Sequence, residues 1–246
     1  MARASLEDES LDVIREISEA DGMRFVLPDV YFTAGRSALR SIRLAMLAAN
    51  LGEPSRILDF ASGGGRVLRY LKAAFPDAEL AACDVVDAYL RFCSGVFGAK
   101  AVKSHLDPSQ VELDGQYDLI WCGSLLSHTD SSDFAGYLRL WESALAPGGV
   151  LVFSVMGRSV TVALRNGMSP LSVNSDEADQ ILQDFASTGF AFVYGVHNPE
   201  AKLGEAVASP AWVCRLLEET PELSLLLYCE ESWEGQDIVA CTKPEA

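Results

Sequence analysis

Apolar residues follow two alternating patterns through the first two thirds of the chain. Short apolar runs typical of buried strands are predicted at Arg56–Phe60, Glu79–Asp84, Lys100–Lys103, Leu119–Cys122 and Val150–Val155. Apolar residues with helical spacing lie between these runs, at Gly65–Phe75, Ala88–Phe97 and Phe134–Leu145. Strands that alternate with helices in this way form a parallel sheet covered by helices on both faces.

Two helices are predicted before the first strand. The apolar spacing indicates one over Leu6–Ala20 and a second over Ser37–Leu51, with Asn50 and Gly52 as stop signals. We therefore expect a helical cap or lid over residues 1–52 and the main domain over residues 53–246.

The last third of the chain departs from this alternation. A helix at Ser175–Ser187, a strand in "FAFVYG" and a helix at Pro210–Glu219 precede two apolar runs, "LSLLLYCEE" and "DIVACTK", with only "SWEGQ" between them. Strands joined without an intervening helix are antiparallel. The predicted class is α/β, a doubly wound and mostly parallel sheet with an antiparallel C-terminal strand pair and a helical N-terminal cap.

The charge and the cysteine content limit the kinds of partner that we expect. The net charge is −16, from 35 acidic and 19 basic residues. Nucleic acids and anionic membranes attract basic surfaces, so neither is an expected partner. The six cysteines form no CxxC pair and the three histidines lie near no cysteine cluster, so no metal site is predicted. No secretory signal or membrane-length apolar run is visible, and we expect a cytoplasmic protein.

A glycine-rich turn, "DFASGGGR", separates the first strand from its helix. A phosphate-binding loop needs Lys and then Ser or Thr after its last glycine, and Arg66-Val67 stands there instead. A dinucleotide fingerprint needs a third glycine where this chain has Leu68 or Arg66. An NAD(P)-dependent oxidoreductase therefore stays only as an alternative.

A cofactor with an amino-acid head and a ribose suits this turn better. Asp59 ends the first strand and offers an acid to an ammonium group, while Gly63 and Gly65 let a ligand approach the backbone. The following helix presents free N–H groups to a carboxylate. Asp84 ends the second strand, and a carboxylate there accepts hydrogen bonds from two ribose hydroxyls. S-adenosylmethionine has both parts.

Four stretches resemble the class I S-adenosylmethionine-dependent methyltransferases, which have a Rossmann-like fold. "LDFASGGGR" is similar to their glycine motif, "CDVV" to the second-strand acid, "YDLIWCGSLLSH" to the fourth-strand motif and "LAPGGVLVFS" to the turn before strand five. The resemblance covers residues 55–154. Ala61 stands where the first glycine is common, a change we expect to be tolerated if Ala61 keeps a negative φ.

The resemblance implies a set of cofactor contacts. Besides Asp59, Gly63, Gly65 and Asp84, it assigns Ala61 and Ser62 to the turn, Val85 to the ribose, Ser104, His105 and Leu106 to the adenine, Cys122, Gly123 and Ser124 to the sulfonium, and Tyr31 and Arg36, beside Gly35, to a lid over the methionine part. The product would be S-adenosylhomocysteine.

His128 is the predicted catalytic residue. It follows the fourth strand in "SLLSHTD", where an imidazole can take the proton of an acceptor hydroxyl or amine. "GSLL" replaces the Asn-Pro-Pro-Tyr type of motif, which favours a small-molecule acceptor for O- or N-methylation. Similarity of the C-terminal hairpin to a methyltransferase subgroup that accompanies glycosyltransferases points to a saccharide-related acceptor. His197 and Trp212 are candidates for the acceptor wall. A non-catalytic scaffold that binds the cofactor is a further alternative.

Overall fold

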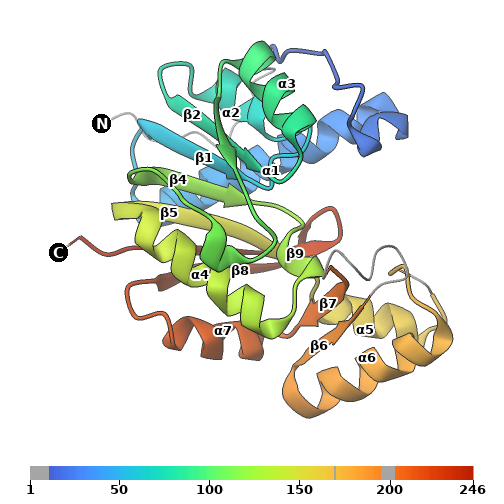
Figure 1. Cartoon of the computed structure of the whole chain (residues 1–246). Coiled ribbons are helices and arrows are strands. Elements are labelled where there is room, and N and C mark those ends of the chain that lie inside the picture. The colour runs from blue at the N-terminus through green and yellow to red at the C-terminus, as the bar shows by residue number, and fades with distance from the viewer. Residues whose placement is uncertain (1–10, 169, 195–202, 246) are drawn as a thin grey trace.

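The computed structural model describes residues 11–168, 170–194 and 203–245. Within them, seven strands form one sheet in the order β3-β2-β1-β4-β5-β9-β8 (Figure 1). Strands β1 to β5 pair in parallel, and β9 and β8 add an antiparallel edge. The predicted fold class is confirmed.

The strand bounds follow the apolar runs closely. The strands of the large sheet are β1 (Arg56–Phe60), β2 (Glu79–Asp84), β3 (Lys100–Lys103), β4 (Tyr117–Cys122), β5 (Leu145–Val155), β8 (Ser224–Trp233) and β9 (Gln236–Thr242). The helices around it are α1 (Pro28–Ala49), α2 (Leu68–Ala74), α3 (Asp87–Phe97), α4 (Ser131–Ala144) and α7 (Pro210–Glu218).

Two apolar layers sandwich the sheet. Helices α1, α2 and α3 pack on the face that carries Ile57, Trp121 and Ile238. Helices α4 and α7 pack on the other face, where Leu58 and Phe153 point. Alternate residues of each strand therefore enter opposite layers, because side chains alternate across a strand.

The N-terminal prediction is wrong in part. Residues 11–18 of the expected Leu6–Ala20 helix run without helical structure, and residues 1–10 lie outside the described part. The guanidinium of Arg69 donates to the carbonyl oxygens of Ile14 (2.6 Å) and Glu16 (2.9 Å), so a buried cation satisfies these carbonyls in place of a helix. Helix α1 also begins at Pro28, well before Ser37, because proline is favoured in a first turn.

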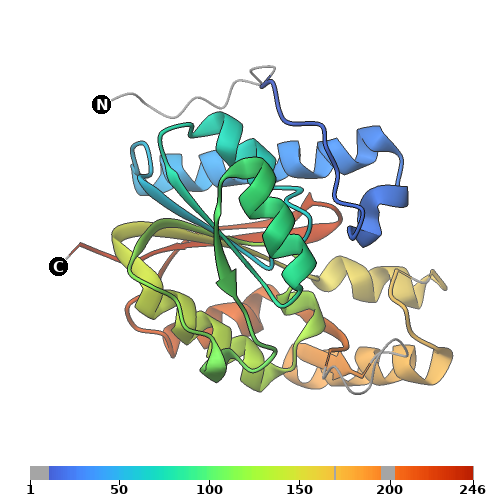
Figure 2. The same ribbon diagram turned by 45° about the horizontal axis from the view of Figure 1, so that its top comes forward.

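A second, smaller layer extends from the end of β5. It contains α5 (Arg158–Arg165), α6 (Ser175–Thr188) and the antiparallel pair β6 (Phe190–Val193) and β7 (Glu205–Ala208). Figure 2 shows this layer below the N-terminal segment, at one end of the large sheet. Helix α5 and strand β7 were not predicted. Across the described residues, no helix is long and apolar enough to span a membrane.

Candidate active site

The backbone of the glycine turn is held in place by hydrogen bonds to the end of β2. The N–H of Ser62 donates to the carbonyl of Cys83 (3.1 Å), and the N–H of Gly63 donates to Oδ2 of Asp84 (2.8 Å). To reach these partners the chain reverses at Ala61, whose φ is +57°. The condition set for tolerating alanine, a negative φ, is therefore not met, and Ala61 holds a strained left-handed conformation.

The three glycines of the turn have different surroundings. A Cβ on Gly63, whose φ is +54°, would meet nothing within 4 Å. A Cβ on Gly64 would lie 2.3 Å from the carboxylate of Asp21, and one on Gly65 would lie 2.4 Å from the ring of Phe97. Gly64 and Gly65 thus serve close packing, and Gly63 is the position that faces free space.

Two buried polar atoms at this turn have no hydrogen-bond partner among the described residues: Oδ2 of Asp59 and Oγ of Ser62. Burial, and next the charge of Asp84, raise the pKa of Asp59 to about 8, against hydrogen bonding from the backbone of Leu68 and the charge of Arg66. Such orphaned groups are costly in a folded protein unless a ligand satisfies them. These oxygens can accept hydrogen bonds from the ammonium end of an amino-acid head group.

Asp84 is already engaged by backbone. Its Oδ1 accepts from Val86 N–H (2.8 Å), besides the bond from Gly63, and burial raises its pKa. Each carboxylate oxygen has a second lone pair, so ribose hydroxyls can still bind. Val85 beside it is exposed at the predicted ribose position.

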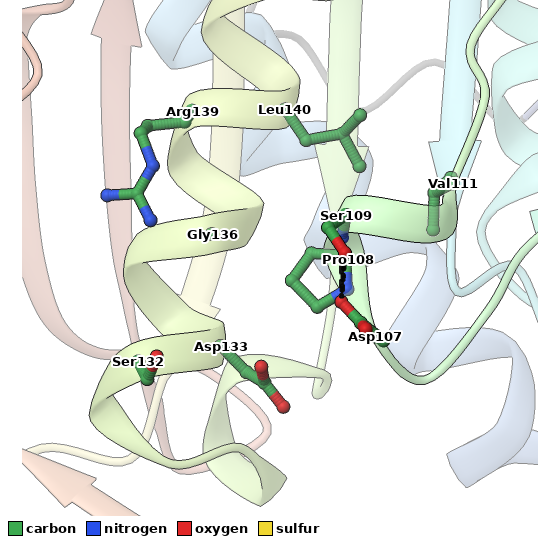
Figure 3. A pocket seen from close by; sticks show the side chains of 9 residues that line it. All are labelled: Asp107, Pro108, Ser109, Val111, Ser132, Asp133, Gly136, Arg139 and Leu140. Carbon is green, nitrogen blue, oxygen red and sulfur yellow. Dashed lines mark hydrogen bonds between the residues drawn. The ribbon is translucent and has the colours of Figure 1, made fainter.

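The predicted adenine stretch lies under α4. Tyr137 donates its hydroxyl to the carbonyls of His105 and Leu106, both at 3.3 Å, which fixes the backbone next to buried Ser104. A cavity of about 410 Å³ adjoins this stretch (Figure 3). Its lining is Asp107, Pro108, Ser109, Val111, Ser132, Asp133, Gly136, Arg139 and Leu140. No residue predicted for the site lines this cavity.

The end of β4 is tied to β5 and β9 by a closed ring of hydrogen bonds. Ser124 N–H donates to Oγ of Ser154 (2.8 Å), that hydroxyl donates to Oε1 of Gln236 (2.8 Å), and Nε2 of Gln236 donates to Oγ of Ser124 (2.6 Å). Ser124 has a φ of +59°. Gly123 is required by packing, since a Cβ there would lie 2.6 Å from the ring of Trp233. Cys122 is fully buried.

The predicted lid residues lie in α1. Tyr31 is fully buried and donates its hydroxyl to Oδ2 of Asp21 (2.7 Å), whereas Arg36 is exposed. Gly35 serves packing, because a Cβ there would lie 2.2 Å from the carbonyl of Arg66.

Sequence reasoning missed the anchor of this region. Arg69 is buried and donates to the carbonyls of Gly65 and Gly64, as well as to Ile14 and Glu16. Burial lowers the pKa of its guanidinium. The one available signal was an arginine at an apolar position of the helix after the turn.

His128 ends the short η3 helix (Leu126–His128), directly after the β4 loop. Its Nδ1 lies 2.8 Å from the carbonyl oxygen of Gly204 and 3.9 Å from Oε2 of Glu205. Trp212 is a packing residue, since its ring stacks on the ring of Phe190 with the centroids 4.4 Å apart. His197 lies outside the described residues.

The fold has many solved relatives. An S-adenosylmethionine-dependent methyltransferase from Clostridium acetobutylicum has a similar structure, with a TM-score of 0.58 and 16% sequence identity. The match covers 86% of this chain and 92% of that one. The 1,6-didemethyltoxoflavin-N1-methyltransferase of Burkholderia thailandensis, solved with S-adenosylhomocysteine, matches with a TM-score of 0.56 and 15% sequence identity. The match covers 88% of this chain and 82% of that one. These likenesses define a class I methyltransferase fold.

The sequence relationship is more specific. The family described as "Methyltransferase domain" matches residues 31–198. This chain belongs to that family. A malonyl-[acyl-carrier protein] O-methyltransferase from Methylococcus capsulatus is 32% identical over 136 residues, which are 53% of this chain and 46% of that protein, so the match spans about half the length of each. Together the findings support S-adenosylmethionine as the cofactor.

Proposed function

We propose that the protein transfers a methyl group from S-adenosylmethionine to an oxygen or nitrogen of a small molecule. The observation that carries this proposal is the pair of buried, unpartnered atoms, Asp59 Oδ2 and Ser62 Oγ, next to Gly63, which faces free space. These atoms lie at the carboxyl end of the central parallel strand, where open α/β sheets bind ligands.

Each residue of the turn has a proposed task. Asp59 receives the ammonium group, the backbone around Gly63 lies along the amino-acid head, and Asp84 accepts the ribose hydroxyls. Arg66, whose charge acts on Asp59, is a further candidate for the carboxylate. Val85, Ser104, His105 and Leu106 frame the ribose and adenine, and Cys122, Gly123 and Ser124 border the sulfonium.

Bound S-adenosylmethionine supplies an activated methyl group on a sulfonium. The protein therefore has to align the acceptor for in-line displacement and exclude water. His128 is the proposed base, because it follows the β4 loop at the same edge of the sheet. A second cavity, of about 580 Å³ between α5 and the β8–β9 turn, has the volume of a small-molecule site. A saccharide-related acceptor stays a proposal from the C-terminal resemblance.

Calorimetry with S-adenosylmethionine, S-adenosylhomocysteine and NAD tests the cofactor. We expect micromolar binding of the two sulfur compounds, and a loss of about 100-fold in Asp59→Asn, which keeps the shape but removes the charge. Asp77→Asn, in an exposed turn at the opposite edge, is the matched control and should bind like the wild type. Tight binding of NAD, or no binding of either sulfur compound, would overturn the proposal.

Turnover separates an enzyme from a binding scaffold. The protein is incubated with S-adenosylmethionine labelled with tritium on the methyl group and with matched small molecules that carry a hydroxyl, an amine or a carboxylate. Transfer of label to one class supports the enzyme. Cofactor binding without transfer to a broad panel favours the scaffold.

A further inference from the structure

Within the part of the chain that the structure describes, strand β7 supplies a charged neighbour of His128, namely Glu205. Gly204 and Glu205 are more than seventy positions away in sequence, yet both meet the imidazole of His128. The backbones of the two segments are also joined, since the N–H of Gly204 donates to the carbonyl of His128 (3.0 Å). The backbone bond holds the two segments together, and the contact of Nδ1 with the carbonyl of Gly204 orients the ring.

The contact with Gly204 selects a tautomer. A carbonyl oxygen only accepts, so the 2.8 Å contact is a hydrogen bond when Nδ1 carries the hydrogen. In the neutral ring the unprotonated nitrogen is then Nε2. The side chain of His128 is 39% exposed, which leaves room for a substrate to reach the ring.

Glu205 adds the charge. Its side chain is 10% exposed and Oε2 lies 3.9 Å from Nδ1, so a mostly buried carboxylate lies beside the nitrogen that faces Gly204. The other acid near the loop, Asp130, is occupied, because its Oδ1 accepts the N–H groups of Ser132 and Asp133 at the start of α4. Strand β5 carries no titratable side chain, so Glu205 is the charged group placed to act on His128 from the packed strands.

We propose that Gly204 and Glu205 position His128 as a general base acting through Nε2, and that the acceptor is consequently a hydroxyl or an amine and not a carboxylate. The inference rests on the proposed methyl transfer. The acceptor oxygen or nitrogen bonds to the methyl carbon as the carbon–sulfur bond breaks, the electron pair of that bond stays on sulfur, and the acceptor proton moves to Nε2. A carboxylate acceptor has no proton to give, and the charge of Glu205 repels it.

The packing around Gly204 fixes the position of its carbonyl next to His128. A Cβ at this position would lie 2.0 Å from the carbonyl of Val193 and 2.8 Å from the ring of Phe192. The chain therefore passes close to β6 just before β7 begins, and this brings the carbonyl of Gly204 to the imidazole. Glu205 is a positioning residue in this arrangement, since it acts through His128.

Nitrogen-15 NMR of the imidazoles tests the tautomer directly. The chain has three histidines, and His128→Gln identifies the signal of His128. We expect the neutral ring of His128 to carry its hydrogen on Nδ1 and to show an unprotonated Nε2. Glu205→Gln should lower the population of this tautomer, and Glu205→Asp should restore part of it. A hydrogen on Nε2 in the wild type would overturn the proposal without any acceptor being known.

The labelled-methyl assay tests the acceptor class. We expect hydroxyl or amine compounds to be labelled and carboxylates not, with kcat lowered about 100-fold or more in His128→Gln and about tenfold in Glu205→Gln. Glu218→Gln, on the exposed face of α7, is the control expected to match the wild type. Calorimetry runs in parallel: absent cofactor binding counts against the proposed function, whereas intact binding with full turnover in His128→Gln, or with labelled carboxylates, counts against this inference alone.

Discussion

The two ends of the candidate site differ in how their polar groups are satisfied. At the glycine turn, Asp59 and Ser62 keep buried atoms without a partner in the described structure. At the end of β4, Ser124, Ser154 and Gln236 close a ring of hydrogen bonds. An unsatisfied buried group is retained at a cost of about 1–3 kcal/mol, so its presence points to a ligand. The turn after β1 therefore has polar atoms left for a ligand, whereas the polar atoms after β4 are satisfied within the protein.

The cavity beside α5 and the segment ahead of α1 expose apolar side chains. Val162 and Met168 of the cavity beside α5 are more than half exposed, and Phe25 and Leu27 ahead of α1 are exposed further still. Exposed apolar side chains can contact ligands of many shapes, whereas polar atoms in fixed positions bind only a head group with matching hydrogen-bonding groups. This difference explains why the sequence identifies a cofactor far better than an acceptor.

The largest expected effect concerns the anchor of the cofactor end. Arg69→Met removes the buried guanidinium that donates to the carbonyls of Ile14 and Glu16. We expect the free energy of unfolding to fall by about 3 kcal/mol, measured by urea denaturation. Arg165→Met, exposed at the end of α5, is the control. Equal stability of the two variants would show that the anchor has no energetic role.

The second prediction is a pH dependence confined to the cofactor end. Because the pKa of Asp59 is raised to about 8, the free carboxyl is mostly protonated below that pH, and binding an ammonium group releases the proton. Affinity for S-adenosylmethionine should therefore rise with pH, by about tenfold per unit between pH 6 and 7.5. Calorimetry in buffers of different ionisation enthalpy counts the proton. Asp59→Asn should bind weakly with no such slope, and a slope that persists in it would assign the proton elsewhere.

The same raised pKa affects the free protein. A carboxyl that prefers to be neutral in the folded state destabilises that state progressively as pH rises from about 4 toward 8. At pH 7 the ligand-free Asp59→Asn should thus melt at a higher temperature than the wild type.

Two glycines sharpen the distinction between packing and binding within the turn. Gly65→Ala places a methyl group against Phe97 at a φ of +74°, so we expect a loss of about 2 kcal/mol of stability. Gly63→Ala has free space and should cost about 1 kcal/mol through its φ alone. Its affinity for the cofactor, however, should fall about tenfold. Denaturation and calorimetry on both variants decide the matter, and unchanged affinity in Gly63→Ala would remove Gly63 from the binding surface.

The smallest effect compares one left-handed residue from each end. Ala61→Gly relieves the strain of a φ of +57° and should stabilise the protein by about 1 kcal/mol. Ser124→Gly relieves a φ of +59° but loses the hydroxyl that accepts from Gln236, so we expect no net gain. Melting temperatures of the two variants test this, and equal gains would show that the hydrogen-bonded ring contributes little.

The strands of the large sheet and the position of the glycine turn could be predicted from the sequence. Strands β2 and β3 have the predicted bounds, since a buried strand needs only a short apolar run between turn signals. The glycines, Asp59 and Asp84 lie within one βαβ unit, so their approach follows from local chain geometry.

The remaining features depend on contacts between segments that are far apart in the sequence. The left-handed Ala61 follows from hydrogen bonds to β2, and the missing N-terminal helix is accompanied by the bonds of Arg69 to Ile14 and Glu16. His128 meets Glu205 because β7 returns to the end of β4 after a long excursion of the chain. Contacts of this kind join segments remote in sequence, and neither spacing nor local propensity encodes which remote segments will meet.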